Sequence, residues 1–426
     1  MFADVVRVCC IATISSYTCS MDPMENPYTP NAGALPPALI GRDDQIDAFR
    51  LLLARLERGR TEKSMIITGL RGVGKTVLLN RFRQIAEDAR WAVVEWEISK
   101  HDDRAFRRAL GSQIRTALLT LSPRERWRER GARAAHVLRS FTLSVDPEGI
   151  LTAGLGAPAP DPIADSGDLL ADLTQLIVAV GEAAREVDRG LVLLLDEVQF
   201  LSPLQFEAVI TALHRSVQRT SPVTFVGAGL PQVAQLAGEA KSYAERLFTF
   251  PRIEDLTDEQ AKAALREPAR QQGADWDDNA LRLASVLTGN YPFFLQELGY
   301  AAWPTAVGPR ITEADVQESA LLYRDRLDTS FFRVRLDRTT DLEKAYLRAM
   351  AELGSEPASA ADVARLLRRT SQQAGATRSG LIEKGLLYSP SHGLAAFTVP
   401  HFDQFMVRAV PSLEPPEVKP RKRRRT

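Results

Sequence analysis

One short segment, residues 69–76 with the sequence GLRGVGKT, constrains the fold more than any other part of the chain. It follows the apolar run 64–68 and precedes a run with helical character, 77–82, which gives the order strand, glycine-rich loop, helix. In a G-x-x-x-x-G-K-[ST] loop, glycines let backbone N–H groups surround a phosphate while the next helix presents its positive end. The segment therefore predicts a nucleotide-binding α/β domain.

The two residues after the last glycine carry the chemistry expected of such a loop. Lys75 places a cation on a first helical turn, against the helix dipole, and a bound anion would offset this cost. Thr76 is expected to hold Mg²⁺ through its hydroxyl. The alternative is an ordinary turn. The residues expected to contact the nucleotide here are Gly69, Arg71, Gly72, Val73, Gly74, Lys75, Thr76 and Val77.

A pair of carboxylates ends the most apolar run of the chain, residues 191–195. A continuous apolar run of this kind predicts a parallel strand that is buried on both faces, and open parallel sheets bind ligands at the carboxyl ends of their strands. Next to a phosphate loop, Asp196 would orient Mg²⁺ and Glu197 would polarise the attacking water. Acidic residues also end strands without any function, so this hypothesis depends on the loop.

Further predicted strands near 91–98 and 223–227 alternate with predicted helices, which indicates a parallel sheet with helices on both faces. Residues 122–167 interrupt this alternation and are interpreted as an insertion. The predicted organisation is a flexible N-terminal arm (1–35), a nucleotide-binding core (36–254), a helical lid with a connecting helix (255–338), a C-terminal domain (339–412) and a disordered basic tail (413–426).

Charge is balanced overall, with 54 basic and 54 acidic residues, but it is unevenly placed. Residues 419–426 contain six basic residues and no acidic one, which leaves 48 basic against 54 acidic residues, or −6, in the rest. Such a tail favours polyanions, although a solvated end is an equally good interpretation. All three cysteines precede residue 20 and no run of eighteen apolar residues occurs, so we expect a cytoplasmic protein with no membrane partner.

With these elements in order, the chain resembles an AAA+ ATPase, with 69–76 as Walker A motif and 191–197 as Walker B motif. Segment 37–42, PALIGR, is similar to the segment that opens the origin-recognition (initiator) group and related archaeal and bacterial ATPases. The resemblance implies ATP and Mg²⁺ as cofactors. It also implies that Ile40, Gly41 and Arg42 lie near adenine, and that Arg246 approaches the terminal phosphate, often from a neighbouring subunit. A surface salt bridge is the alternative for Arg246.

Two departures from the family pattern bear on turnover. The strand that usually ends in a polar sensor residue ends in 226–229, VGAG. The lid carries 288–292, TGNYP, which is similar to lids of signalling-type NTPases, so Tyr291 and Pro292 are expected near the nucleotide. Missing sensors predict slow hydrolysis without a partner, as in a switch.

The last third resembles a winged helix-turn-helix domain, because three predicted helices precede a hairpin around 386–399. In that fold the third helix enters the major groove of DNA and the hairpin contacts the backbone. The domain is not strongly basic, and winged helices also bind proteins. The residues that would face double-stranded DNA are Arg368, Arg369, Gln372, Gln373, Thr377, Arg378 and His392.

The leading hypothesis is an AAA+ ATPase that acts as a nucleotide-dependent switch and engages DNA through a winged helix. A homo-oligomer is one of the assemblies considered. The alternative is a signalling-type NTPase switch that binds a protein partner instead of DNA. A scaffold without ATPase activity is disfavoured because Lys75, Thr76, Asp196 and Glu197 are all present.

Overall fold

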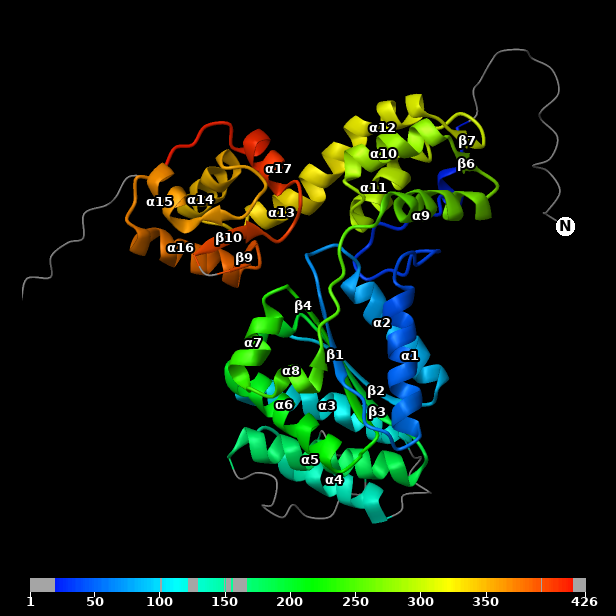
Figure 1. The fold of residues 1–426 in the computed structure, drawn as a ribbon, viewed down its shortest axis with the longest axis vertical. Coiled ribbons are helices and arrows are strands. Elements are labelled where there is room, and N and C mark those ends of the chain that lie inside the picture. Colours follow the sequence, from blue (N-terminus) through cyan, green and yellow to red (C-terminus); the bar gives the residue numbers. More distant parts are fainter. Residues whose placement is uncertain are drawn as a thin grey trace, which may run out of the picture.

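The computed structural model describes residues 20–99, 102–121, 129–148, 150, 155, 167–391 and 393–416. Figure 1 shows three parts: a core built on a sheet, a helical lid above it, and a C-terminal domain beside the lid. The His392 and basic-tail (419–426) predictions lie outside the described residues.

The core is a five-stranded parallel sheet, as the alternation of strands and helices predicts. The strands lie in the order β2-β3-β4-β1-β5, so β4 separates the strand before the phosphate loop from the strand before the acidic pair. Met65 is paired with Val226, and Leu191 with Val223. The strands are β1 (Ser64–Thr68), β2 (Ala92–Glu97), β3 (Leu191–Asp196), β4 (Val223–Gly229) and β5 (Phe248–Thr249).

Helices cover both faces of this sheet, and two hydrophobic clusters lie on its two sides. On one face, α1 and α2 are joined by the stacked rings of Phe49 and Phe82, 4.3 Å apart. On the other face, α3 and α5 are joined by a buried ion pair of 2.7 Å between Arg107 and Asp172. The helices are α1 (Asp43–Glu57), α2 (Lys75–Asp88), α3 (Asp103–Leu121), α5 (Leu169–Glu186) and α6 (Pro203–Gln218).

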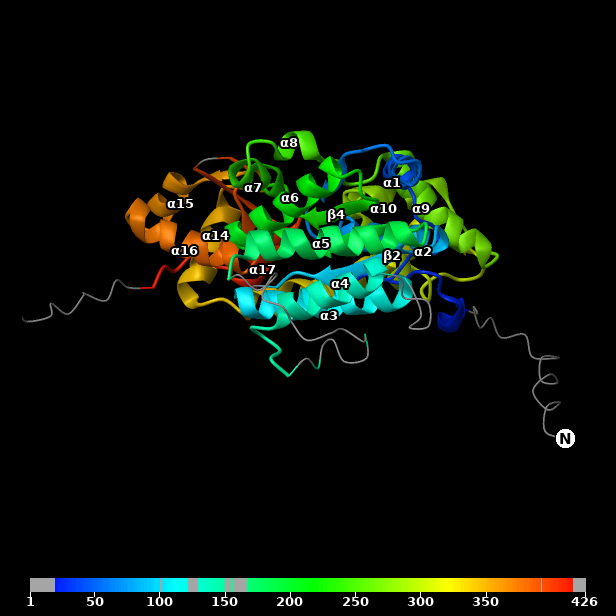
Figure 2. The same ribbon diagram turned by 90° about the horizontal axis from the view of Figure 1, so that it is seen from below.

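A helix within the segment interpreted as an insertion, α4 (Glu129–Thr142), packs against α3 and α5 (Figure 2). After β4 come α7 (Val233–Ala240) and α8 (Ala244–Leu247). The fifth strand is limited to Phe248 and Thr249. The residues before it form α8 because Ala, Glu, Arg and Leu are all good helix formers.

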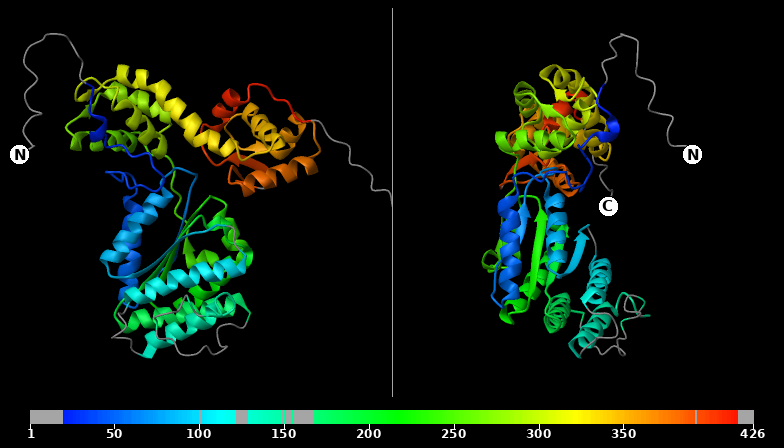
Figure 3. Two further views of the ribbon diagram at one scale, coloured as in Figure 1. Left: turned by 180° about the vertical axis from the view of Figure 1, so that it is seen from behind. Right: turned by 90° about the vertical axis from the view of Figure 1, so that its right-hand side faces the viewer.

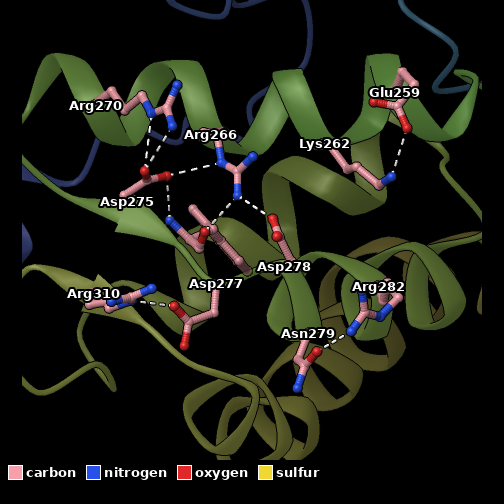
Figure 4. A network of polar contacts seen from close by, with 11 residues as sticks. Glu259, Lys262, Arg266, Arg270, Asp275, Asp277, Asp278, Asn279, Arg282 and Arg310 are labelled. Carbon is pink, nitrogen blue, oxygen red and sulfur yellow. Dashed lines mark hydrogen bonds and ion pairs between the residues drawn. The ribbon is translucent and has the colours of Figure 1, made fainter.

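The lid consists of α9 (Asp258–Gln271), α10 (Asp278–Thr288) and α11 (Pro292–Ala302), with the two-residue strands β6 (Asp275–Trp276) and β7 (Arg310–Ile311). A surface network joins three of these elements (Figure 4). Arg266 on α9 contacts Asp275 at 3.0 Å and Asp278 at 2.7 Å. The hydrogen bond from Arg266 lowers the pKa of Asp278.

The described part of the N-terminal arm, from Ser20 onward, is docked on the lid, whereas a flexible arm was expected over 1–35. The physical reason is Tyr28, which is only 1% exposed. Its hydroxyl donates to the carbonyl of Leu265 at 2.5 Å and accepts from the indole N–H of Trp276 at 2.7 Å. A Cβ on Gly299 would lie 2.6 Å from the Tyr28 ring, so glycine at that position leaves room for the arm.

Replacing Tyr28 with alanine should lower the free energy of unfolding by about 3 kcal/mol, because a buried aromatic side chain is lost. Tyr28→Phe keeps the ring but removes the acceptor of the buried Trp276 indole N–H, and should cost about 1–2 kcal/mol. Urea unfolding of both variants measures the difference. An alanine variant as stable as the wild type would show that the arm does not pack on the lid in solution.

A long connector leads from the lid to the C-terminal domain (Figure 3). It comprises α12 (Glu313–Arg326), a π-helix (Leu327–Phe332) and α13 (Arg333–Leu336). The wider π-turn and α13 bring Phe331 and Arg335 to the cavity beside residues 69–76 that is described below.

The C-terminal domain has the element order helix, strand, helix, helix, strand, strand, followed by a last helix. Its three strands form an antiparallel sheet in the order β8-β10-β9. Its elements are α14 (Asp341–Glu352), β8 (Ala358–Ser359), α15 (Ala360–Leu366), α16 (Ser371–Glu383), β9 (Leu387–Tyr388), β10 (Leu394–Phe397) and α17 (Phe402–Ala409).

Across the described ranges, no helix combines the length and the apolar character that crossing a lipid bilayer requires.

Candidate nucleotide-binding site

The glycine-rich loop connects the carboxyl end of β1 to the first turn of α2. Gly72 and Gly74 have φ angles of 90° and 95°, in the left-handed region that favours glycine. A Cβ on Gly72 would lie 3.0 Å from the ring of Tyr291, and a Cβ on Gly69 would meet the carbonyl oxygen of Ile253. The loop is therefore held from outside by the lid and by the segment after β5, while its backbone curls around the start of α2.

Lys75 is buried at the start of α2 and has no carboxylate within ion-pair distance among the described residues. Its ammonium group donates to the carbonyls of Gly69 at 2.9 Å and Leu70 at 2.8 Å. Burial lowers the pKa of Lys75 to about 8, although Glu197 and Asp196 nearby oppose the shift. A phosphate in the loop would supply the missing counter-charge, so the lysine fits a nucleotide.

Thr76 and Asp196 meet although 120 residues separate them, because β1 and β3 end at the same edge of the sheet. The hydroxyl of Thr76 donates to Oδ2 of Asp196 at 2.5 Å. Burial raises the pKa of Asp196, and the hydrogen bond from Thr76 opposes that shift. A hydroxyl beside a carboxylate is a donor set that suits Mg²⁺, and a cation there would offset the cost of the buried carboxylate.

Glu197 follows Asp196 in a left-handed conformation, with φ 54°, that is uncommon for a residue with a side chain. Its carboxylate lies 3.4 Å from the guanidinium of Arg71 and also accepts a hydrogen bond from the Gln199 amide. The same amide's oxygen accepts from the backbone N–H of Leu230 at 3.2 Å, just after β4. Gln199 therefore links Glu197 to the end of the strand where no polar sensor residue could be assigned.

A cavity beside the loop is lined by Glu197 and by the N-terminal arm. Part of its lining is apolar and suits a planar base. The apolar residues include Pro30, Ile40, Leu256, Ala264 and Pro292. The loop and most of the catalytic candidates form the polar part of the lining. These are Arg71, Gly72, Val73, Gly74, Lys75, Thr76, Val77 and Glu197.

Three residues expected to contact the nucleotide lie behind the loop instead of lining this cavity. Gly41, with φ 70°, packs against Gln260; a Cβ there would lie 2.7 Å from that side chain. Gly69 accepts the Lys75 hydrogen bond described above. The Tyr291 hydroxyl donates to the carbonyl of Arg71, so Tyr291 supports the loop. The physical reason is close packing of lid and core, which fills the space behind the glycines.

Arg42 borders the cavity but its guanidinium is used to join segments. It donates to the carbonyls of Val73 at 3.0 Å and Glu254 at 2.9 Å, and burial lowers its pKa. The arginine thus fastens the start of α1 to the phosphate loop.

Arg246 is not brought together with the other catalytic candidates. It is exposed on α8, just before β5, and Phe248 of β5 pairs with Ser64, the first residue of β1. Arg246 therefore lies toward the opposite end of the sheet from the loop, which follows the last residue of β1. Any contact between Arg246 and a nucleotide requires a second chain.

The cavity residues that the sequence did not indicate include Gln296, Phe331 and Arg335. Gln296 is tied to the arm, because its side-chain oxygen accepts from the backbone N–H of Thr29 at 3.0 Å. Only the aromatic pair at 331–332, followed by several arginines, marks the connector as unusual. No sequence motif indicates that this region reaches the loop.

Some of the residues expected to face DNA are exposed to solvent, and others are half-buried. Arg368, Gln372 and Gln373 are exposed around the start of α16, and Arg368 has a φ of 51°. The oxygen of Gln373 caps α16 by accepting from Thr370 at 3.1 Å. Thr377, half-buried, donates to its own helix.

The two other arginines of this group are turned into the domain. Arg369 donates to the carbonyl of Pro416. Arg378 is partly buried beside Tyr346, and two of its guanidinium nitrogens have no hydrogen-bond partner. Arg368 is therefore the freest cation of the set.

Comparisons with known proteins bear on two parts of the chain. Residues 38–226 match the family model described as AAA ATPase domain. Residues 329–406 match a second model, described as a domain of unknown function (DUF8462). No curated protein gives a significant match.

Solved structures resemble the chain over most of its length. The Walker-type ATPase PABY2304 of Pyrococcus abyssi has a TM-score of 0.54 at 13% identity, covering 86% of this chain and 96% of that one. The Aeropyrum pernix ORC1 protein in complex with DNA has 0.44 at 16%, covering 88% and 94%. Cdc6p from Pyrobaculum aerophilum has 0.45 at 15%, covering 92% and 98%. At these identities the likeness concerns the fold.

Proposed function

We propose that this chain, whose residues 38–226 are an AAA ATPase domain, binds ATP with Mg²⁺, hydrolyses it slowly, and uses the bound nucleotide to control its C-terminal domain. The observation that carries the proposal is the convergence of Lys75, Thr76 and Glu197 on one cavity with a partly apolar lining, with Asp196 bonded to Thr76 beside it. Thr76 and Asp196 would hold Mg²⁺. Bound there, the ion would neutralise charge that develops on the phosphates.

Different residues of the chain would contribute to different steps of hydrolysis. The loop and Lys75 would fix the phosphates, which lowers the barrier by orientation and charge. Glu197 would accept a proton from the attacking water. Its present pairing with Arg71 and Gln199 occupies the carboxylate, so activation requires those contacts to rearrange. This supports slow basal turnover.

A direct contact between loop and C-terminal domain supports the switch. The backbone N–H of Arg71 donates to the carbonyl of Thr398 at 3.0 Å. On the same side, Gly385 lies so close that an added Cβ would stand 2.7 Å from the Arg71 guanidinium. A change at the phosphate end of the cavity therefore acts on the C-terminal domain without an intermediate element.

Double-stranded DNA is the proposed target of that domain, on the strength of its element order and of exposed Arg368 and Gln372 at the start of α16. Arg368→Ala should weaken duplex binding several-fold and reduce its salt dependence, because one phosphate or base contact is lost. Fluorescence anisotropy of a labelled duplex measures this. Arg365→Ala is the matched control, since Arg365 is exposed on the same segment but paired with Asp362.

A protein partner is the second candidate, favoured because Arg369 and Arg378 are half-buried, the former donating to the carbonyl of Pro416. Absence of duplex binding at any salt concentration would exclude the DNA target and leave this candidate. ATP turnover with and without duplex, over a range of protein concentrations, tests both. Stimulation of ATP turnover by duplex supports DNA as the target. A rise in specific activity with protein concentration supports an ATPase site shared between chains.

A further inference from the structure

An arginine from outside the AAA ATPase domain faces the nucleotide cavity. Arg335 lies on α13, within the 329–406 segment that matches the domain of unknown function. It lines the same cavity as Lys75, Thr76 and Glu197. A residue of the C-terminal half thus borders the phosphate end of the site, and neither matched family description assigns it a role.

A chain of aromatic contacts positions this guanidinium over the loop. The guanidinium carbon of Arg335 lies 4.0 Å from the centre of the Phe331 ring, and one of its nitrogens donates to the Phe331 carbonyl. Phe331 stacks on Phe293 of the lid, with ring centres 4.5 Å apart. The backbone N–H of Phe293 donates to the carbonyl of Gly72 in the phosphate loop at 3.3 Å. These contacts leave the arginine little freedom to turn away from the loop.

The guanidinium has no acidic partner in the described part of the chain. Burial and the nearby cations Arg71 and Arg338 together lower the pKa of Arg335 to about 10, against the attraction of Glu197. Glu197 is itself already paired with Arg71. A half-buried cation beside two others is unfavourable unless an anion enters, so the phosphate end of the cavity has a surplus of positive charge.

We propose that Arg335 binds the terminal phosphate of ATP in the same chain. The inference rests on the proposed ATP site and adds to it a sensing residue from the C-terminal half. The terminal phosphate is assigned because Arg335 shares the cavity with Lys75 and Glu197 and lies close enough to Glu197 for the two charges to interact. Loss of that phosphate would release α13 and, with it, the domain that follows.

The experiment compares equilibrium binding of fluorescent ATP and ADP analogues, with Mg²⁺, to the full chain and four variants: Arg335→Ala, Arg335→Lys, Arg333→Ala and Lys75→Ala. Arg335→Ala should weaken ATP binding about tenfold, the loss of one charge-assisted hydrogen bond, with a much smaller effect on ADP. Arg333 is the matched control, because it lies on the same short helix but is exposed and outside the cavity. Arg335→Lys keeps the charge and should lose less affinity for ATP than Arg335→Ala.

The outcomes separate this inference from the proposed function. Equal binding of ATP by the wild type and Arg335→Ala, or equal losses for ATP and ADP, overturns the assignment while nucleotide binding stands. Failure of the wild type to bind either nucleotide overturns the proposed function itself. Thermal unfolding without nucleotide shows whether Arg335→Ala folds. If it does not fold, the test uses the ratio of ATP to ADP affinity in Arg335→Lys. A ratio equal to that of the wild type overturns the assignment.

Discussion

Replacing Glu197 with glutamine is expected to reduce ATP turnover at least about a hundredfold, because glutamine keeps the shape of the side chain but cannot accept a proton from water. Nucleotide affinity should stay within about a factor of three or rise, because removing a negative charge beside the phosphates does not weaken their binding. Single-turnover phosphate release and equilibrium binding of a fluorescent ATP analogue measure the two quantities. The variant should therefore accumulate in the ATP-bound state.

The control for this experiment is Glu254→Gln. Glu254 is exposed and paired with Arg252 on the surface, so its carboxylate takes no part in the cavity. Turnover of that variant should equal that of the wild type. If Glu197→Gln also hydrolysed ATP at the wild-type rate, the general base would have to be another group, and the pairing of Glu197 with Arg71 would be purely structural.

The phosphate end of the site could be predicted from the sequence because local rules determine it. A glycine-rich loop between strand and helix places Lys75 and Thr76 on the first turn of α2, and a buried strand delivers Asp196 to the same edge of the sheet. The α/β fold with a parallel sheet is confirmed for the same reason. The roles of these residues in hydrolysis stay predictions until turnover is measured.

The remaining contacts depend on tertiary packing, which no local pattern encodes. Tyr291 was expected beside the nucleotide because of a short lid motif, yet its hydroxyl donates a hydrogen bond to the Arg71 carbonyl. Arg335 enters the cavity only because the π-helix and the stack of Phe331 on Phe293 set its direction. Spacing along the chain cannot indicate that residues separated by 38 positions will stack in this way.

The buried ammonium of Lys75 provides a test of nucleotide binding through pH. In the free protein its pKa is about 8, so the lysine is neutral over much of the range above pH 8. A bound phosphate stabilises the charged form, so binding above pH 8 must also take up a proton. The pKa of Lys75 is lower in the free protein than in the ATP complex, so the affinity for ATP falls as pH rises.

Between pH 7 and pH 9.5 the dissociation constant for ATP should therefore increase about thirtyfold, since each unit above the free pKa costs about a factor of ten. Lys75→Arg is the decisive comparison, because a guanidinium stays charged over this range and its variant should lose most of this pH dependence. Arg335, whose pKa is lowered to about 10, is common to both proteins and cancels in the comparison. Isothermal titration calorimetry in buffers of different ionisation enthalpy would also detect the proton taken up at pH 9. Equal pH profiles for wild type and Lys75→Arg would mean that Lys75 stays charged in the free protein, with its two carbonyl partners sufficient to hold the ammonium.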